Sequence, residues 1–554
     1  MNKKIKILIF FLIVGVAAVL RLWQLGQIPP SPDWDEAALG YNAYSIMTTG
    51  KDEYGKLFPV ILQSFDDYKP ALYAYLVIPF IKLIGLNTLA VRLPSAIFGI
   101  IAVISTYFLT KELFFGKKGE YLALLSAFLL AISPWHLQFS RIGFEAQVGL
   151  SLNLLAVLFL LKGLKKYYYL LFSAFFASLS IYVYQSEKVY LPILLLSLVI
   201  IFWREIGKIP KRWLASSVVV GIVLVAPMLL SIISNQDSLL RAKGVSVFSD
   251  QTQFLKQNAQ KYEYDIESKD YLGIILDNRR FEYVKAITAG YIAHFDLNWL
   301  FINGDIERHH APFMGLLYLF ELPLILIGMY QLVYGKFSKK TKLTIFAIFL
   351  IAPIPASITS GVPHAVRTIN FLPTFQIFTA IGILALISFV LNIKSQIFNI
   401  KIAKILIVSY FLFAIFNFTY YINQYFVQQN YYFSQNWQYG YKQAIDYIKP
   451  IAGRFDKIIV TNERPLDQSY IFFLFYLKYD PEQYQKSGGT VSGGFREEHS
   501  GFANYTFRPI DWEKDKNLSN TLFIGRPDDF PEGNKTIKKI NYLDGSGAIV
   551  IVQN

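Results

Sequence analysis

The sequence lacks cysteine and has few charged residues. None of its 554 residues is cysteine, so disulfide bonds and metal sites built from thiolates are excluded. Only 17% of the residues are charged and 54% are hydrophobic, whereas a soluble domain carries about 25% charged residues. This composition excludes a soluble enzyme, a disordered chain and a small disulfide-linked scaffold. It predicts a polytopic membrane protein.

Long hydrophobic runs are abundant, and they predict the fold class. A helix needs about 20 apolar residues to cross a membrane. Hydropathy therefore predicts an all-α membrane protein with about eleven transmembrane helices. The expected spans cover residues 6–23, 93–110, 121–135, 146–161, 168–185, 188–203, 213–233, 312–333, 342–360, 368–391 and 402–423. The first span is expected to stay in the protein, because no small-residue cleavage site follows it.

Basic residues outnumber acidic ones, and their placement predicts the orientation. The net charge is +14, from 53 Lys and Arg against 39 Asp and Glu. In a soluble protein this excess would suggest a nucleic-acid partner, but here the basic residues lie in short loops between apolar runs. With the expected spans, these loops share the side of the N-terminus, which the excess of Lys and Arg marks as cytoplasmic. The basic loops are residues 3–6, 111–118, 162–166, 204–212, 336–342 and 394–404.

Three large segments then lie on the outer side. Two are the loops 24–92 and 234–311, and the short apolar run 71–86 in the first loop is expected to be a juxtamembrane or re-entrant helix. The third follows residue 425, where DKIIVTN, NTLFIGRP and GAIVIVQN predict strands and YKQAIDYIK predicts an amphipathic helix. We therefore expect a transmembrane domain over residues 1–425 and a small extracytoplasmic α/β domain over residues 426–554.

The first outer loop carries the clearest candidate chemistry. Asp33 can cap a helix that begins at Trp34. Asp35 and Glu36 then fall in its first turn, where the helix dipole favours carboxylates. Two readings are open, because these acids can serve catalysis or can simply stabilise the start of the helix.

A second polar cluster precedes Pro70 in the same loop. It consists of Asp66, Asp67 and Lys69. A lysine at a membrane surface can hold a lipid phosphate, and a nearby carboxylate can take a proton from an attacking hydroxyl. The alternative for Lys69 is snorkelling to the membrane surface.

Further polar groups on the outer side are weaker candidates. Arg141 and Glu145 are spaced one helical turn apart, so they can pair or belong to a substrate site. His364 and Arg367 stand at the outer mouth of an expected span, where Arg367 can stabilise a phosphate or anchor the helix at the headgroups. The dense polar run 305–310 is read as a solvated loop, with contact to sugar or acceptor as the alternative.

The order of these motifs resembles the GT-C glycosyltransferases. The Asp-Glu pair after the first span, the Lys-Pro before an aromatic helix, and VRLPSAIFG at the start of the next span carry the resemblance. It is similar, more narrowly, to protein O-mannosyltransferases and aminoarabinose transferases, over residues 1–200 and more loosely over 290–390. The resemblance implies a GT-C fold and an inverting transfer of a sugar, such as mannose, from a polyprenyl-phosphate donor. The acceptor would be a protein, lipid or glycan outside the cytoplasm.

The resemblance also implies residue roles. Asp35 corresponds to the base that acts on the acceptor, with Glu36 beside it. Lys69 matches the lysine that meets the lipid phosphate, and Arg92 matches an arginine at the head of the second span.

The sequence departs from this family at a metal position. Aminoarabinose transferases bind a metal with an acid directly before the lysine, and here that residue is Tyr68. Asp67 with His294 or His364 could rebuild a divalent metal site, so a metal stays open as a cofactor.

Two other classes of function are alternatives. A transporter or flippase for a lipid-linked sugar predicts charged residues within the spans, and the spans hold few. A non-catalytic envelope protein predicts that Asp35→Asn leaves function intact.

Overall fold

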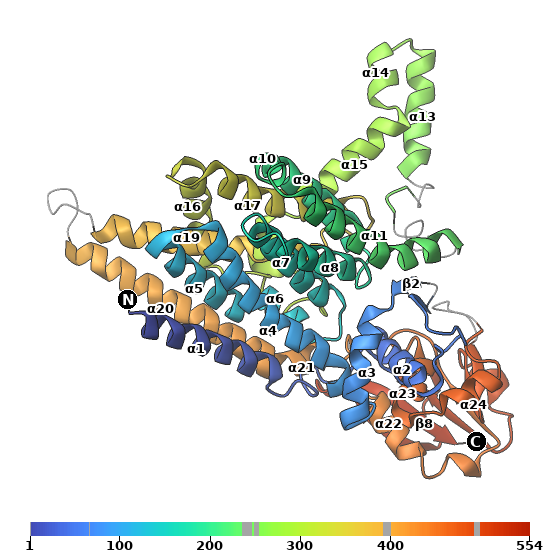
Figure 1. Cartoon of the computed structure of the whole chain (residues 1–554). Helices are drawn as coiled ribbons and strands as arrows, with labels where there is room; N and C mark the ends of the chain where they lie inside the picture. Colours follow the sequence, from blue (N-terminus) through green and yellow to red (C-terminus); the bar gives the residue numbers. More distant parts are fainter. Residues whose placement is uncertain are drawn as a thin grey trace.

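The computed structural model describes residues 2–65, 67–234, 246–248, 254–391, 400–491 and 499–553. Most of the chain is helical, and a mixed β-sheet follows near the C-terminus (Figure 1). The helices at the predicted spans are α1 (Lys3–Leu22), α4 (Thr88–Leu113), α5 (Gly116–Ile132), α7 (Ala146–Gly163), α8 (Tyr169–Ile181), α9 (Glu187–Ile201), α11 (Lys211–Ser234), α16 (Glu321–Tyr334), α17 (Lys339–Ile351), α19 (Thr374–Leu391) and α20 (Ile400–Asn423).

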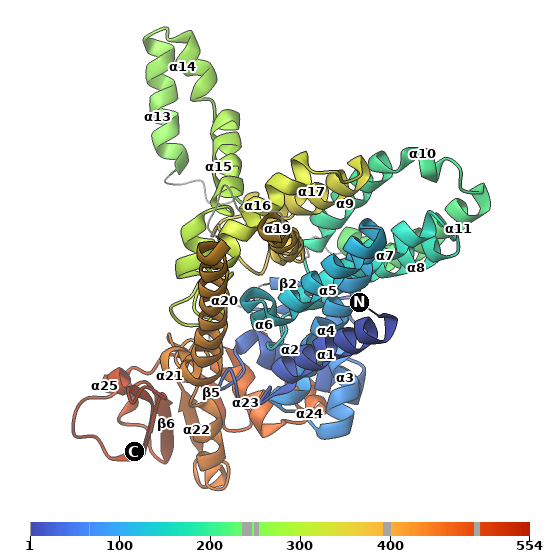
Figure 2. The same cartoon turned by 90° about the vertical axis from the view of Figure 1, so that its left-hand side faces the viewer.

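Shorter helices connect these elements. They are α2 (Trp34–Thr49), α3 (Leu72–Ile84), α6 (Pro134–Phe139), α10 (Trp203–Ile206), α13 (Phe254–Glu267), α14 (Tyr271–Leu276), α15 (Arg279–Ala293), η2 (Trp299–Asn303), α18 (Ile354–Ser357), η3 (Ile369–Phe371), η4 (Gln424–Gln428) and α21 (Gln429–Phe433). Figure 2 shows that α13 and α14 project away from the other helices, joined to them through α15.

Every predicted span coincides with a helix, but not all of these helices have full transmembrane length. Among the described residues, seven helices are long and apolar enough to cross a membrane. The others, α5, α8, α9 and α16, have 17, 13, 15 and 14 residues. The predicted start of the span 312–333 is wrong, because Phe313 has a positive φ of 55° and Gly315 is pressed against the backbone of Phe301, so the helix begins only at Glu321.

The structure brings several of the basic loops together at one end of the helices. Lys165 pairs with Glu112, and Lys340 pairs with Glu205. Thr341 Oγ1 donates to the carbonyl of Leu113 at 2.9 Å. The loops around residues 112, 165, 205 and 340 therefore share one side, as the charge pattern predicts. That this side faces the cytoplasm stays a prediction, and the basic cluster 394–404 falls largely outside the described residues.

The loop 24–92, which the sequence predicts to be the first outer loop, folds at the opposite end of these helices. Here α2 is followed by the antiparallel hairpin of β1 (Ile61–Ser64) and β2 (Asp67–Pro70), in which Leu62 lies opposite Lys69. The short helix α3 comes next and packs along the start of α4, where the Tyr73 hydroxyl donates to the carbonyl of Val91 at 2.9 Å. The structure confirms a short apolar helix within residues 71–86, and its juxtamembrane position stays a prediction.

The C-terminal region forms a six-stranded sheet in the order β4-β5-β3-β6-β8-β7, in which β3 runs parallel to β5 and β6 and the other pairs are antiparallel. Its elements include the predicted strands and the predicted amphipathic helix α22. They are α22 (Tyr441–Ile448), η5 (Ala452–Arg454), β3 (Lys457–Val460), α23 (Ser469–Leu477), α24 (Pro481–Lys486), β4 (His499–Phe502), β5 (Tyr505–Phe507), α25 (Trp512–Asp515), β6 (Thr521–Gly525), η6 (Pro527–Asp529), β7 (Thr536–Asn541) and β8 (Gly547–Gln553).

This region shares its hydrophobic core with the first outer loop. Buried Tyr41 of α2 and Tyr73 of α3 belong to the same cluster as Phe472 and Phe475 of α23. The helix of α20 also continues through η4 and α21 to Phe433, beyond the predicted boundary at residue 425. The division into two domains therefore stays a prediction.

A buried carboxyl group fastens the two regions to each other. Glu53 is fully buried, and its side chain accepts hydrogen bonds from Asn42 Nδ2 and Thr490 Oγ1, both at 2.9 Å. Burial raises the pKa of Glu53 to about 7, although these hydrogen bonds act in the opposite direction. The contact between loop and sheet thus contains a group that titrates near neutral pH.

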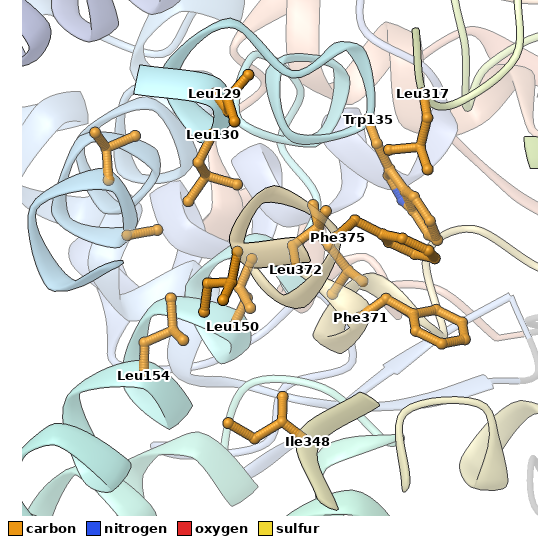
Figure 3. Packing of buried hydrophobic residues seen from close by; sticks show 14 of the residues in the cluster. Leu129, Leu130, Trp135, Leu150, Leu154, Leu317, Ile348, Phe371, Leu372 and Phe375 are labelled. Atoms are coloured by element: carbon orange, nitrogen blue, oxygen red, sulfur yellow. The ribbon is translucent and has the colours of Figure 1, made fainter. Parts of the chain in front are cut away.

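The transmembrane helices pack around a second core. Figure 3 shows Leu130 of α5, Trp135 of α6, Leu150 of α7 and Phe375 of α19 meeting in this cluster. The indole of Trp135 also donates to the carbonyl of Ala365 at 3.2 Å. This packing fixes the segment after α18, which carries His364, against α6.

Candidate active site

The first turn of α2 is held from several sides. Asp33 caps it, because its Oδ1 accepts from the backbone N–H of Glu36 at 2.9 Å. The other oxygen of Asp33 accepts from Arg308 at 2.6 Å, and the guanidinium of Arg308 lies 4.2 Å from the ring centre of Trp34. The backbone N–H of Trp34 donates to Gln438. Asp35 is thereby fixed within a rigid turn.

Glu36 and Arg92 form a completely buried ion pair. Nε and Nη2 of Arg92 donate to the two oxygens of Glu36 at 2.8 Å, and both side chains have 0% exposure. The remaining donor interactions of Arg92 go to the carbonyls of Leu25, Pro29 and Ser31. Neither Glu36 nor Arg92 lines the cavity around Asp35, so this arrangement does not support the predicted roles of Glu36 in catalysis and of Arg92 in phosphate binding.

Asp35 and Lys69, the two main candidates from the sequence, form an ion pair. Lys69 Nζ donates to Asp35 Oδ1, with the side chains 11% and 27% exposed. Burial alone would lower the pKa of Lys69, but the carboxylates of Asp35 and Glu145 outweigh it and raise that pKa. Lys69 is therefore a cation that is held next to an accessible carboxylate.

This pair lines a cavity of about 150 Å³. Segments that are far apart in the sequence close around it, namely the start of α2, the end of β2, and the loops that precede α7, α9, α16 and α19. The lining residues are Asp35, Lys69, Pro70, Phe144, Glu145, Tyr184, Gln185, Ile306, Arg308, His309, His364 and Val366. The cavity thus combines two cations, two carboxylates and two histidines with apolar walls.

Two predicted neighbours, Arg141 and Glu145, separate in the structure. Arg141 donates to backbone carbonyls that include Leu20 at 2.7 Å and Trp23 at 2.8 Å. Their predicted pairing is therefore wrong, because Arg141 turns toward the end of α1 while Glu145 turns into the cavity. Burial raises the pKa of Glu145 to about 7, although Lys69 acts to lower it.

Asp305, His309 and His364 form the candidate metal site. One ligand atom from each lies within 4.8 Å of the others, and an Asp-His-His set suits Zn²⁺ or a similar divalent ion. His309 Nδ1 lies 2.8 Å from Asp305 Oδ2. Only His364 of this set is expected as a metal ligand from the sequence, because the run 305–310 reads as a solvated loop.

The other predicted metal ligands are not in this cluster. Both ring nitrogens of His294 are occupied, since Nδ1 lies 2.7 Å from the carbonyl of Gly290 and Nε2 accepts from the backbone N–H of His364. His294 is therefore wrong as a metal ligand in this arrangement. Asp66 and the side chain of Asp67 lie outside the described residues.

The supporting cation of the cavity is Arg308 rather than Arg367. Arg367 donates to Thr359 Oγ1 at 2.6 Å and to the carbonyl of Ser360 at 2.8 Å, and it does not line the cavity. The prediction of Arg367 as a direct phosphate ligand is therefore not supported, whereas Arg308 lines the cavity wall. The density of polar residues in IERHH was the signal in the sequence for this site.

Comparisons with known proteins bear on the fold of the chain. A family model described as dolichyl-phosphate-mannose-protein mannosyltransferase matches residues 68–230. The structure of ArnT from Cupriavidus metallidurans bound to undecaprenyl phosphate superimposes with a TM-score of 0.54 at 13% identity, over 98% of this chain and 97% of that chain. Its apo state gives the same values.

The chain has the GT-C fold. This confirms the resemblance inferred from the sequence and the all-α fold class of a multi-pass membrane protein. An Archaeoglobus fulgidus oligosaccharyltransferase tethered to an acceptor peptide is a more distant match, with a TM-score of 0.48 at 12% identity over 86% of this chain and 63% of that chain. No curated protein sequence matches the chain in the corresponding comparison.

Proposed function

We propose that this GT-C protein is a membrane glycosyltransferase that moves a sugar from a polyprenyl-phosphate donor to an acceptor outside the cytoplasm. The observation that carries the proposal is the ion pair of Asp35 and Lys69 on the wall of a cavity between the outer loops. The mannosyltransferase family model over residues 68–230 supports mannose as the first sugar to test.

The cavity supplies groups for both halves of the reaction. The bond between the anomeric carbon and the phosphate oxygen breaks, and its electron pair stays on the phosphate. Lys69 and Arg308 stabilise the charge that develops there. The acceptor hydroxyl attacks the anomeric carbon from the opposite face, which inverts it, and its proton passes to Asp35. Polyprenyl phosphate leaves.

The ion pair of the resting protein determines the order of the reaction steps. Before the donor enters, Lys69 is bound to Asp35. A donor phosphate competes for the lysine, and the carboxylate of Asp35 is then released to accept a proton. A divalent ion held by Asp305, His309 and His364 would add positive charge to the same cavity.

The test measures polyprenyl phosphate release from a panel of polyprenyl-phosphate sugars by the purified full-length protein. Asp35→Asn is expected to abolish release and Lys69→Ala to slow it strongly, and the matched control Glu307→Gln, an exposed neighbour outside the cavity lining, is expected to retain it. Turnover that survives both changes would refute the assignment. Donor that crosses the membrane without being cleaved would favour a flippase instead.

The outer location of the site has its own test. Because the chain has no cysteine, single cysteines at Glu307 and at Lys117 can be labelled without background. An impermeant thiol reagent applied outside cells is expected to label position 307 and not position 117. The reverse pattern would overturn the proposed orientation.

A further inference from the structure

A second and larger pocket shares no lining residue with the Asp35 cavity. Its volume is about 740 Å³. Its walls come from the end of α1, the loop 24–31, the start of α4, α22 and the end of α23. Arg92, which is paired with Glu36, donates to the carbonyls of Leu25 and Ser31 in the wall of this pocket, and neither Glu36 nor Arg92 lines it. The pocket is therefore separate from the proposed donor site.

The position of the pocket places it at a membrane boundary. It is lined by Leu22, the last residue of α1, and by Thr88, the first residue of α4, and both helices are candidate membrane spans. Their neighbouring surface is apolar, with Val19 62% and Trp23 61% exposed. A lipid whose chains lie along this surface would present its headgroup to the pocket, whichever side of the membrane it is on.

The charge of the pocket suits an anionic headgroup. Lys442, Lys449 and Lys478 line it, and its one lining carboxylate, Asp446, is already paired with Lys442 at 2.7 Å. Two lysines thus remain to neutralise a phosphate. The side-chain oxygen of Gln443 also lines this region and has no hydrogen-bond partner within the described part of the chain, so it can accept from a headgroup hydroxyl.

The membrane-side wall of the pocket is rigid before any lipid binds. Arg92 donates to the carbonyls of Leu25, Pro29 and Ser31 at 3.1, 2.8 and 2.7 Å. Arg141 donates to the carbonyl of Ile28 at 3.2 Å. These buried guanidinium groups hold the loop 24–31 in one conformation, which reduces the entropic cost of binding.

We propose that this pocket binds the headgroup of an anionic phospholipid and thereby attaches the C-terminal region to the membrane surface. Lys449 and Lys478 would hold the phosphate of the headgroup, and we propose that this phosphate belongs to a membrane lipid. The acyl chains run along α1 and α4, and the headgroup lies between those helix ends and α22.

The test uses the full-length protein in detergent micelles with fluorescently labelled phosphatidylglycerol. The double variant Lys449→Gln/Lys478→Gln is expected to bind it about 10- to 30-fold more weakly, because each lysine near a lipid surface contributes about fivefold. The matched control Lys457→Gln/Lys535→Gln, which removes two exposed lysines of the same region outside the pocket, is expected to stay within about twofold of the wild type.

Further measurements distinguish binding of the lipid from binding of a soluble phosphate compound. Lys449→Arg/Lys478→Arg is expected to keep binding, and labelled phosphatidylcholine is expected to show no dependence on these lysines. Soluble glycerophosphoglycerol is expected to compete only weakly. Unchanged phosphatidylglycerol binding in the double glutamine variant, an equal loss in the matched control, or competition by the soluble headgroup at the same concentration as the lipid would each overturn the proposal.

Discussion

Adjacent acids in the first turn of α2 are expected to respond to substitution in opposite ways. Glu36→Gln should destabilise the protein, whereas Asp35→Asn should leave it folded and inactive. The reason is their environment, because Glu36 is fully buried against Arg92 and Asp35 is partly exposed in the cavity.

The size of the effect follows from the contacts of Glu36. Its oxygens accept from two nitrogens of Arg92 at 2.8 Å, from the backbone N–H of Gly143 at 2.6 Å and from that of Asp33 at 3.3 Å. A glutamine keeps one acceptor oxygen and turns an NH₂ group toward other donors, and the buried guanidinium loses its counter-charge. Removing one member of a buried ion pair costs about 3–5 kcal/mol. Asp35→Asn breaks a pair whose carboxylate is 27% exposed and leaves Lys69 beside the carboxylate of Glu145, so it costs less than the loss of Glu36.

Unfolding in mixed micelles of dodecyl maltoside and SDS, followed by tryptophan fluorescence, measures this difference. Glu36→Gln should unfold at a clearly lower SDS fraction than the wild type, and Asp35→Asn at nearly the same fraction. Polyprenyl phosphate release measured on the same samples should be lost in Asp35→Asn. A Glu36→Gln protein with wild-type stability and no activity would refute the reasoning, since it would return Glu36 to a catalytic role.

Three further outcomes are expected. Lys69→Ala should slow polyprenyl phosphate release about 10²- to 10³-fold at unchanged stability, as loss of a group that stabilises developing charge does; an unfolded variant would contradict this. One equivalent of Zn²⁺ should remain with the dialysed protein and be lost in His364→Ala, as measured by elemental analysis, and equal metal content would contradict the ligand assignment. The contribution of Glu53 to the stability should fall by about 3 kcal/mol between pH 4.5 and 7, because native Glu53, whose pKa is raised from 4.5 to about 7, keeps a proton that the unfolded chain releases. In Glu53→Gln this share of the pH dependence should disappear, and an unchanged profile in mixed-micelle unfolding would contradict it.

The sequence by itself determined the membrane class, the positions of the helices and the start of α2. These features are local, because hydropathy acts over about 20 residues and a capping box needs only Asp33 and Glu36. The pairing of Asp35 with Lys69 could also be predicted from the sequence, since both lie in one predicted outer loop and match the order of motifs in GT-C proteins.

Only the tertiary structure decided which charged residues reach the cavity. Glu36, Arg92 and Arg141 resemble site residues in the sequence but are buried in contacts with distant backbone, whereas Arg308 and His309 come from a loop that reads as solvated. A charged side chain is costly to bury unless it is paired and hydrogen-bonded. Its role therefore depends on partners that a linear sequence does not place beside it, and the fold alone supplies them.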